Sequence, residues 1–324
     1  MTEHTRITPP QAGSERKSLF ERAEEMFGGR SHMPMPVPRD LAAPVNRKPV
    51  VRPVVTATAA PAPIAAEAAA PPSEPMHFNE DVVHHIDRAL LARHGLIQPE
   101  AQVTELFEEF RIVKRRVLAS VRKAREAGSG AMAQRVLVCS PLPGEGKSFT
   151  AANLALAMAA EKDTEVLLVD ADFAKPSVLS LFGLPRGPGF MDVLANPNIA
   201  LEDCILATDI AGLHVLPAGN HTNSDSEYLA SSRTAEVLDM LTQGSPGRIV
   251  IFDSSPALAA SPAAELAHHV GQAIVVARAD RTGQGALEDA LTLLSACPDL
   301  KLLLNAAHFS PSGRRFGAYY GQET

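Results

Sequence analysis

Short runs of Val, Ile and Leu alternate with helix-length segments from Arg135 onward, and this alternation constrains the fold more than any other feature. Strands are expected at residues 135–140, 165–170, 213–217, 248–253, 272–278 and 301–305. Helices are expected between most of them, at 148–160, 226–242, 261–269 and 284–295. Continuous apolar strands separated by helices indicate an α/β fold with a mostly parallel sheet and helices on both faces. Ligands of such sheets bind beyond the carboxyl ends of the strands.

The N-terminal quarter of the chain has a different composition. Residues 14–27 place apolar side chains at helical spacing before two glycines, which predicts a short amphipathic helix within residues 1–30. This helix either docks on a partner or a membrane surface, or is a frayed helix with no partner. Residues 33–75 contain eleven prolines and eleven alanines, so residues 31–76 are predicted to be a disordered linker.

A folded domain is predicted from residue 77 to residue 305, followed by a flexible tail at 306–324. The domain begins with a long amphipathic helix over residues 101–127, whose apolar stripe includes Val103, Phe110 and Val121. The basic second half of this helix fits phosphate contact, a solvated charged face or a subunit contact. The tail is polar and contains glycine, which predicts mobility.

Charge and cysteine content exclude several classes of protein. The net charge of −7 argues against a surface that binds nucleic acid throughout, although a local basic patch remains compatible with it. The three cysteines are far apart and have no histidines at metal-ligand spacing, so neither a disulfide framework nor a zinc site is indicated. No apolar run has the length of a membrane span or of a secretion signal, which predicts a cytoplasmic protein.

Residues 140–148, SPLPGEGKS, follow the first predicted strand and precede a predicted helix. A glycine-rich turn that leads into a helix N-terminus directs backbone N–H groups at phosphate oxygens. In this pattern Lys147 reaches the β and γ phosphates, and the Ser148 hydroxyl binds Mg²⁺. Pro141 stands at the usual first glycine position, so a coincidental turn is the alternative. The strand before and the helix after favour a phosphate loop.

Three aspartates follow predicted strands. Asp170 and Asp172 end the second strand, and Asp253 ends the fourth. Buried carboxylates are costly to ionise unless a cation or a donor meets them, and Mg²⁺ bound to ATP supplies such a cation. A single aspartate after a strand is more often a helix cap or a turn residue. Three of them beside a phosphate loop predict a magnesium clamp.

These segments resemble the bacterial tyrosine kinases, or BY-kinases, which belong to the deviant Walker group of P-loop ATPases. The resemblance covers about two thirds of the chain, and the closest look-alikes are cytosolic tyrosine autokinases of exopolysaccharide export systems, in particular the exosortase-associated group. It rests on residues 140–148 as Walker A, VLLVDADFAKPS at 166–177 as the second acidic motif and IVIFDSSP at 249–256 as Walker B. Further support comes from EYLAS at 227–231, LLLN at 302–305 and a tail with two adjacent tyrosines.

The resemblance implies an ATP-dependent protein-tyrosine autokinase with ATP and Mg²⁺ as cofactors. The implied catalytic residues are Lys147, Asp170, Asp172 and Asp253, with Asp170 as the candidate to orient or deprotonate the attacking phenol. The implied metal-binding residues are Ser148, Asp172 and Asp253, acting directly or through water. The implied nucleotide-binding residues are Gly144, Glu145, Gly146, Lys147, Ser148, Phe149 and Asn305. Asn305 would meet the adenine, and an asparagine that caps a turn is the alternative.

The resemblance also implies acceptors and partners. The acceptors are Tyr319 and Tyr320, two of only three tyrosines in the chain, although chance or a solubilising tail also accounts for them. Tyr228 lies at a predicted helix start and is expected to be packed. The oligomerisation motif implied for a ring of subunits is Glu108, Arg111 and Lys114, with a plain row of surface ion pairs as the alternative. Other implied partners are a membrane-spanning polysaccharide co-polymerase, which would recruit the chain to the inner face of the cytoplasmic membrane, and a tyrosine phosphatase.

Two departures from the family pattern bear on activity. Ala174 stands where many members have arginine, which leaves Lys175 as the nearest cation, and the tyrosine cluster is reduced to two residues. The main alternative function is a partition-type or septum-positioning ATPase, a nucleotide-dependent dimerisation switch on the same core. Those proteins usually carry a signature lysine where Leu142 stands here. A scaffold with a decayed site is disfavoured because Lys147, Ser148 and the three aspartates are present.

Overall fold

The computed structural model describes residues 76–307. The predicted helix within residues 1–30, nearly all of the predicted linker at 31–76 and the tyrosine-bearing part of the predicted tail at 306–324 lie outside the described residues. These three expectations, together with Tyr319 and Tyr320, therefore stay predictions.

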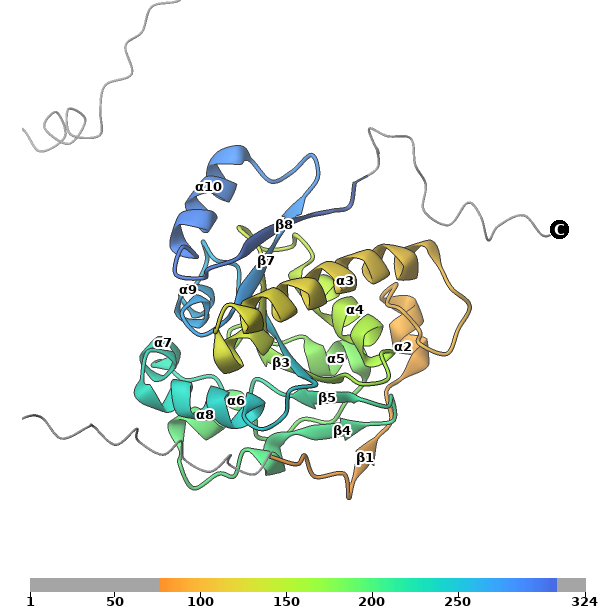
Figure 1. Ribbon diagram of the computed structural model, residues 1–324, viewed down its shortest axis with the longest axis vertical. Coiled ribbons are helices and arrows are strands. Elements are labelled where there is room, and N and C mark those ends of the chain that lie inside the picture. The colour runs from red at the N-terminus through yellow and green to blue at the C-terminus, as the bar shows by residue number, and fades with distance from the viewer. Residues whose placement is uncertain (1–75, 308–324) are drawn as a thin grey trace, which may run out of the picture. The chain divides into compact units, whose positions relative to one another are not determined.

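Eight strands form one sheet in the order β1-β4-β5-β3-β6-β2-β7-β8 (Figure 1). Every neighbouring pair is parallel except β4 and β5, so the predicted mostly parallel sheet is confirmed. Six strands lie within one residue of their predicted limits, whereas β1 and β4 were not predicted because they are too short to show a pattern. The strands are β1 (Val83–His84), β2 (Arg135–Cys139), β3 (Glu165–Ala171), β4 (Leu206–Thr208), β5 (Leu213–Leu216), β6 (Arg248–Ser254), β7 (Gln272–Arg278) and β8 (Leu300–Asn305).

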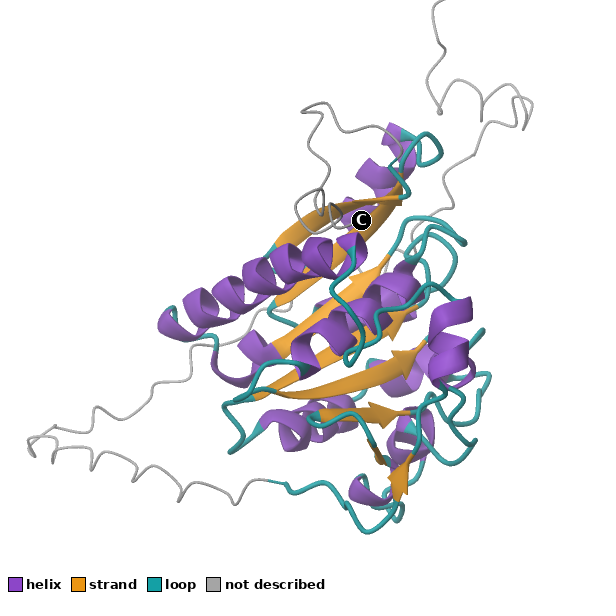
Figure 2. Ribbon diagram, turned by 90° about the vertical axis from the view of Figure 1, so that its right-hand side faces the viewer, coloured by secondary structure: helices purple, strands orange, loops and turns teal. Residues whose placement is uncertain are grey.

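Helices cover both faces of the sheet (Figure 2). On one face lie α2 (Arg88–Arg93), α3 (Glu105–Glu126), α4 (Lys147–Ala159) and α5 (Val178–Phe182). On the other face lie α6 (Phe190–Ala195), α7 (Asp225–Leu229), α8 (Ser232–Thr242), α9 (Pro262–Ala267) and α10 (Gln284–Leu293). The central strand β3 shows the consequence, because Leu167 and Val169 pack into one core while Val166 and Leu168 pack into the other. Burial on both faces explains its uninterrupted apolar sequence.

Two helix predictions differ from the structure. The helix expected over 101–127 begins at Glu105, because the Thr104 hydroxyl accepts a hydrogen bond from Phe107 N (3.2 Å) and caps it. Val103 therefore precedes the helix and is exposed, so its place in the apolar stripe was wrong. The helix expected over 226–242 is interrupted at Ala230 and Ser231, where the extended backbone of Ser231 starts α8.

The sheet brings the predicted acidic residues to one edge. Strands β3 and β6 are neighbours, and Asp170 pairs in register with Asp253. The phosphate-loop candidate at residues 140–146 leaves β2, which is the next strand along on the other side of β6. None of the helices within residues 76–307 is long and apolar enough to cross a membrane.

Candidate nucleotide-binding site

The loop between β2 and α4 has the conformation of a phosphate cradle. Gly144 and Gly146 adopt positive φ angles of 78° and 100°, a region that favours glycine. A Cβ atom on Gly146 would lie 2.0 Å from the Asn305 amide nitrogen, so this position also lacks room for a side chain. Helix α4 begins at Lys147, directly after the loop. Its free N–H groups and positive dipole end suit the binding of phosphate oxygens.

The side chain of Glu145 stabilises this loop from inside. It is only 3% exposed, accepts a hydrogen bond from Leu142 N (2.7 Å) and accepts a second from the Thr282 hydroxyl in the turn after β7. Arg278, the last residue of β7, donates to Gly144 O (3.3 Å). The Glu145 carboxylate is thus engaged by the protein, and nucleotide binding by the backbone of Glu145 stays a prediction.

Asn305 also contacts the phosphate loop. Its Nδ2 donates to Glu145 O (2.9 Å), and its Oδ1 accepts from the N–H of Ala306 (2.8 Å). Both the nitrogen and the oxygen of this side-chain amide are thus hydrogen-bonded to the chain's own backbone. Contact between Asn305 and adenine stays a prediction, and the structure gives this residue a role in holding the loop. Thr282, Arg278 and the bracing role of Asn305 are features that the sequence analysis missed.

Lys147 and Asp172 form an ion pair at the entrance to α4. Their Nζ and Oδ2 atoms are 2.6 Å apart, and the two side chains are 13% and 5% exposed. The Lys147 ammonium also lies 3.3 Å from the Ser148 hydroxyl. The predicted phosphate-binding lysine, the predicted magnesium-binding serine and one predicted carboxylate are therefore brought together.

Asp253 is a fully buried carboxylate, and neither of its oxygens has a hydrogen-bond partner within residues 76–307. Burial raises the pKa of Asp253 from 3.8 to about 7. The nearby Lys147 ammonium and the Ser148 hydroxyl oppose this rise, and the charge of Asp170 adds to it. A buried carboxylate with unmatched oxygens is costly unless a cation meets it. The residues present therefore fit a divalent cation.

Magnesium that accompanies a nucleotide usually takes one or two protein carboxylates, with phosphate and water completing the octahedron. Ser148, Asp172 and Asp253 are the residues that would hold it here. Across residues 76–307, no three or more His, Cys, Asp or Glu side chains gather as a metal cluster. The nucleotide and water would supply the other ligands of a bound Mg²⁺.

Asp170 has different contacts from Asp253. It is buried, and its carboxylate accepts hydrogen bonds from the backbone N–H groups of Asp172 (3.2 Å), Ser177 (2.9 Å) and Val178 (2.9 Å). Burial raises its pKa to about 6, and these hydrogen bonds oppose the rise. They fold the segment 172–178 over Asp170. The geometry supports a role in holding this segment, and the role of proton acceptor stays a prediction.

A cavity of about 570 Å³ opens beside the phosphate loop, and we call it the phosphate-loop cavity. Lys147, Ser148, Phe149, Asp172 and Lys175 contribute to its walls. Ser255, which the sequence analysis did not single out, also lines it, is 2% exposed and has a hydroxyl without a partner among the described residues. The volume is in the range of small-molecule sites, and its wall contains the residue types that bind phosphate and magnesium.

The predicted oligomerisation residues do not share one open surface. Glu108 and Arg111 form an ion pair on α3, as their spacing predicts. Lys114, by contrast, is 6% exposed, donates to Ala157 O (3.1 Å) and pairs with Glu161 (2.6 Å). Lys114 packs against α4 in its own chain, so the expectation that it faces a neighbouring subunit is wrong. Tyr228 is half-buried in α7 and packs against the core, as predicted.

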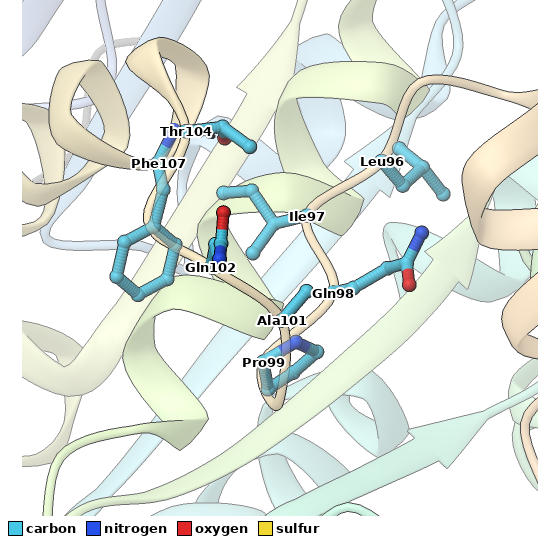
Figure 3. Close-up of a pocket in the computed structure, with 8 residues that line it drawn as sticks. All are labelled: Leu96, Ile97, Gln98, Pro99, Ala101, Gln102, Thr104 and Phe107. Atoms are coloured by element: carbon cyan, nitrogen blue, oxygen red, sulfur yellow. Dashed lines mark hydrogen bonds between the residues drawn. The ribbon is translucent and has the colours of Figure 1, made fainter. Parts of the chain in front are cut away.

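A smaller hollow of about 80 Å³ lies where the chain enters α3 (Figure 3). It is lined by Leu96, Ile97, Phe107 and neighbouring residues of this entry segment, and it shares none of them with the phosphate-loop cavity. The Ile97 N–H donates to the buried Asn153 side chain of α4 (2.7 Å), which ties the segment to the domain. The volume is too small for a nucleotide.

Fold and site together define a P-loop nucleotide-binding protein. No family model matches the chain. Similar proteins do exist, among them EpsB of Ralstonia solanacearum, which carries the name of a tyrosine-protein kinase and is 33% identical over 189 residues, or 58% of this chain and 25% of EpsB. Tyrosine-protein kinase YwqD of Bacillus subtilis is 32% identical over 188 residues, or 57% of this chain and 77% of YwqD.

The chain therefore belongs to the bacterial tyrosine-protein kinases. Among solved structures, the chimerical protein CapA2B2 superimposes with a TM-score of 0.53 at 26% identity, covering 68% of this chain and 92% of that one. The likeness confirms the predicted family and the P-loop fold. The chain spans about a quarter of the length of EpsB, so what the longer relatives do as whole proteins is not transferred here.

Proposed function

We propose that the chain is an ATP-dependent protein-tyrosine autokinase, which transfers the γ-phosphoryl group of Mg-ATP to Tyr319 or Tyr320 of a neighbouring copy. The observation that carries the proposal is the edge shared by β3 and β6. There the carboxylate of Asp253, which has no hydrogen-bond partner among residues 76–307, lies close to Lys147 and Ser148 at the phosphate loop. Membership of the tyrosine-kinase family supports transfer to tyrosine in place of simple hydrolysis.

Each residue has a defined task in this proposal. The loop N–H groups and Lys147 bind the phosphates, which requires Lys147 to exchange the Asp172 carboxylate for phosphate oxygens. Ser148, Asp172 and Asp253 hold the magnesium, which neutralises charge on the phosphates when it is bound. Asp170 keeps the segment 172–178 in place. Catalysis then depends mainly on positioning and on neutralisation of charge.

In the reaction, the tyrosine oxygen forms a bond to the γ-phosphorus while the bond from that phosphorus to the bridging oxygen of ADP breaks. The phenol proton passes to water or to a nearby carboxylate. A free phenol has a pKa near 10 and is mostly protonated at neutral pH, so a proton acceptor is needed at some point. Each phosphate added to the tail brings a charge of about −1.5 to −2, and repulsion between such tails would loosen an assembly of subunits.

The biological setting belongs to the same proposal. By the resemblance to exopolysaccharide autokinases, the cycle of assembly and release would regulate polysaccharide synthesis or export. It would act through a membrane-spanning co-polymerase, which recruits the chain to the inner face of the cytoplasmic membrane, and a tyrosine phosphatase would reset it. If the purified chain phosphorylated its tail at full rate with no partner added, the activating partner would be unnecessary.

The test is a map of phosphorylated residues by mass spectrometry after incubation of the full chain with Mg-ATP. Phosphotyrosine at 319 or 320 is expected, and it should be absent from Lys147→Met and from the variant with Tyr319→Phe and Tyr320→Phe. The double tyrosine variant should still bind ATP, which separates loss of the acceptor from loss of the site. Release of free phosphate without any phosphotyrosine would refute the kinase and support a partition-type ATPase switch.

A further inference from the structure

A second cavity, of about 330 Å³, lies beside the phosphate-loop cavity at the carboxyl ends of β3 and β5. The two cavities share Pro176 and Ser180 in their walls, and both residues are exposed. These two residues therefore form a ridge that separates the cavities and faces solvent. A chain that crosses this ridge would contact both cavities. We call the second cavity the ridge pocket.

The walls of the ridge pocket are held rigidly. On one side lie Leu179 of α5 and Leu184, which supply apolar surface. On the other side the turn after β5 is fixed by Asp192, which accepts hydrogen bonds from Gly189 N (2.9 Å), Asn220 N (3.1 Å) and Asn220 Nδ2 (2.8 Å). A pocket whose walls are set in advance loses little entropy when it binds a flexible segment.

The charge at the pocket suits an acidic group. Arg186 lines the pocket, is exposed, and has no carboxylate within 4 Å among residues 76–307. The carboxylate of Asp192 is taken up by the turn, and that of Asp170 is buried and holds three backbone N–H groups. Within the described part of the chain, the pocket therefore presents a guanidinium with no carboxylate partner, and a guanidinium binds carboxylates well.

We propose that the ridge pocket binds the acceptor segment of a second copy of this chain, with Arg186 paired to Glu323 while Tyr319 or Tyr320 reaches the phosphate-loop cavity. The inference rests on the proposed function. Glu323 is the acidic residue that follows the two tyrosines, and Arg314 and Arg315 precede them. Binding in the reverse direction would bring these arginines toward Arg186. Arg186 thus sets the direction in which the segment crosses the ridge.

The test separates enzyme and substrate on different full-length chains. The enzyme chain carries Tyr319→Phe and Tyr320→Phe, and the substrate chain carries Lys147→Met, so phosphate passes only from the first to the second. In the enzyme chain, Arg186→Glu is expected to raise the KM for the substrate chain roughly five- to tenfold, while the KM for ATP stays unchanged. The matched control is Lys162→Glu, which reverses an exposed cation just before the amino end of β3 and should change neither value.

Exchanging the charges of Arg186 and Glu323 between the two chains gives a second test. A purely structural role of Arg186 would not make the KM depend on the charge at position 323. A substrate chain with Glu323→Arg is expected to have a raised KM on the unaltered enzyme chain and a lower one on the Arg186→Glu enzyme chain. Two results would overturn the assignment of the pocket. One is an Arg186→Glu enzyme chain whose KM for the substrate chain is unchanged. The other is an Arg186→Glu enzyme chain with equal KM values for the substrate chains with and without Glu323→Arg. If the unaltered pair transferred no phosphate to tyrosine at all, the kinase proposal itself would fail, which is a distinguishable result.

Discussion

Buried charges at the two ends of the central strands have opposite surroundings, because they are paired at the amino ends and like-charged at the carboxyl ends. At the amino ends, Arg248 opens β6 and Glu165 opens β3, and the two form an ion pair of 2.7 Å. Arg248 also donates to Leu241 O (3.0 Å) and Met76 O (2.7 Å), and its guanidinium lies 3.8 Å from the centre of the Phe78 ring. At the carboxyl ends of the same strands, two aspartates of like charge lie side by side, and Asp253 has no hydrogen-bond partner among the described residues.

The difference separates a structural charge from a functional one. A buried charge that is paired and hydrogen-bonded contributes to a defined fold, and removal of its partner is costly. A buried charge without partners opposes folding, and such charges are found mainly at functional sites, where they bind a ligand. The amino end should therefore respond to mutation mainly through stability, and the carboxyl end mainly through binding and activity.

The largest expected effect comes from Lys147→Met at the carboxyl end. Loss of this ammonium removes charge stabilisation on the transferred phosphoryl group, and it should lower the rate of tyrosine phosphorylation by roughly 10²- to 10³-fold or more. The rate is measured with labelled ATP on folded protein. A lysine-to-methionine change at exposed Lys162 should leave the rate as it is. A Lys147→Met protein that kept the full rate would refute the site.

At the amino end, Arg248→Met should lower the free energy of unfolding by about 2–4 kcal/mol, because it leaves Glu165 without its cation and two backbone carbonyls without a donor. Denaturant unfolding measures the change. The protein that remains folded should bind ATP with unaltered affinity. A large loss of ATP affinity with little loss of stability would contradict the contrast between the two ends.

Asp253→Asn should stabilise the protein, in contrast to Arg248→Met. We expect it to raise the free energy of unfolding by about 1–3 kcal/mol at pH 8 without nucleotide or magnesium. The pKa of Asp253 is about 7 in the folded chain against an ordinary 3.8. At pH values between these two, Asp253 therefore holds a proton in the folded state and has lost it in the unfolded state. The contribution of Asp253 to stability therefore falls as pH rises from about 4 to about 7 and levels off above that.

The same variant should reduce the slope of stability against pH in that range. The slope that remains should come from Asp170 and Glu109, whose raised pKa values act in the same direction, and from His214, whose lowered pKa acts in the opposite direction. Unfolding measured at a series of pH values in the presence of a chelator tests this. The control is Asp163→Asn at an exposed position before β3. A destabilised Asp253→Asn protein at pH 8 would show that the carboxylate is not an opposing charge.

The smallest effect is expected from the link between Thr282 and Glu145. Thr282→Val removes the hydroxyl that donates to the buried Glu145 carboxylate, which should weaken ATP binding roughly five- to tenfold through a less ordered phosphate loop. Thr282→Ser retains the donor and should restore the affinity. Equal dissociation constants for the Val and Ser variants, measured by calorimetry, would exclude this role of the hydroxyl.

The sequence predicted what depends on local pattern and missed what depends on distant packing. The apolar strands, the glycine-rich loop and the aspartates at strand ends are all visible along the chain, so the sheet and the residues at its edge could be predicted. The contact between Thr282 and Glu145 joins residues 137 positions apart. Lys114 shares a helical row with Glu108 and Arg111, and the sequence does not reveal that this part of the row packs against α4. Burial of these two contacts is set by tertiary structure alone.

The edge formed by β3 and β6, together with the loop after β2, should bind a nucleotide with its magnesium. Titration calorimetry of the full chain with ATP, in the presence of Mg²⁺ and again in the presence of a chelator, measures it most directly. One binding site per chain is expected, with an affinity that depends on Mg²⁺ and is lost in Lys147→Met. No heat of binding in the intact chain, or equal binding by the Lys147→Met variant, would contradict it.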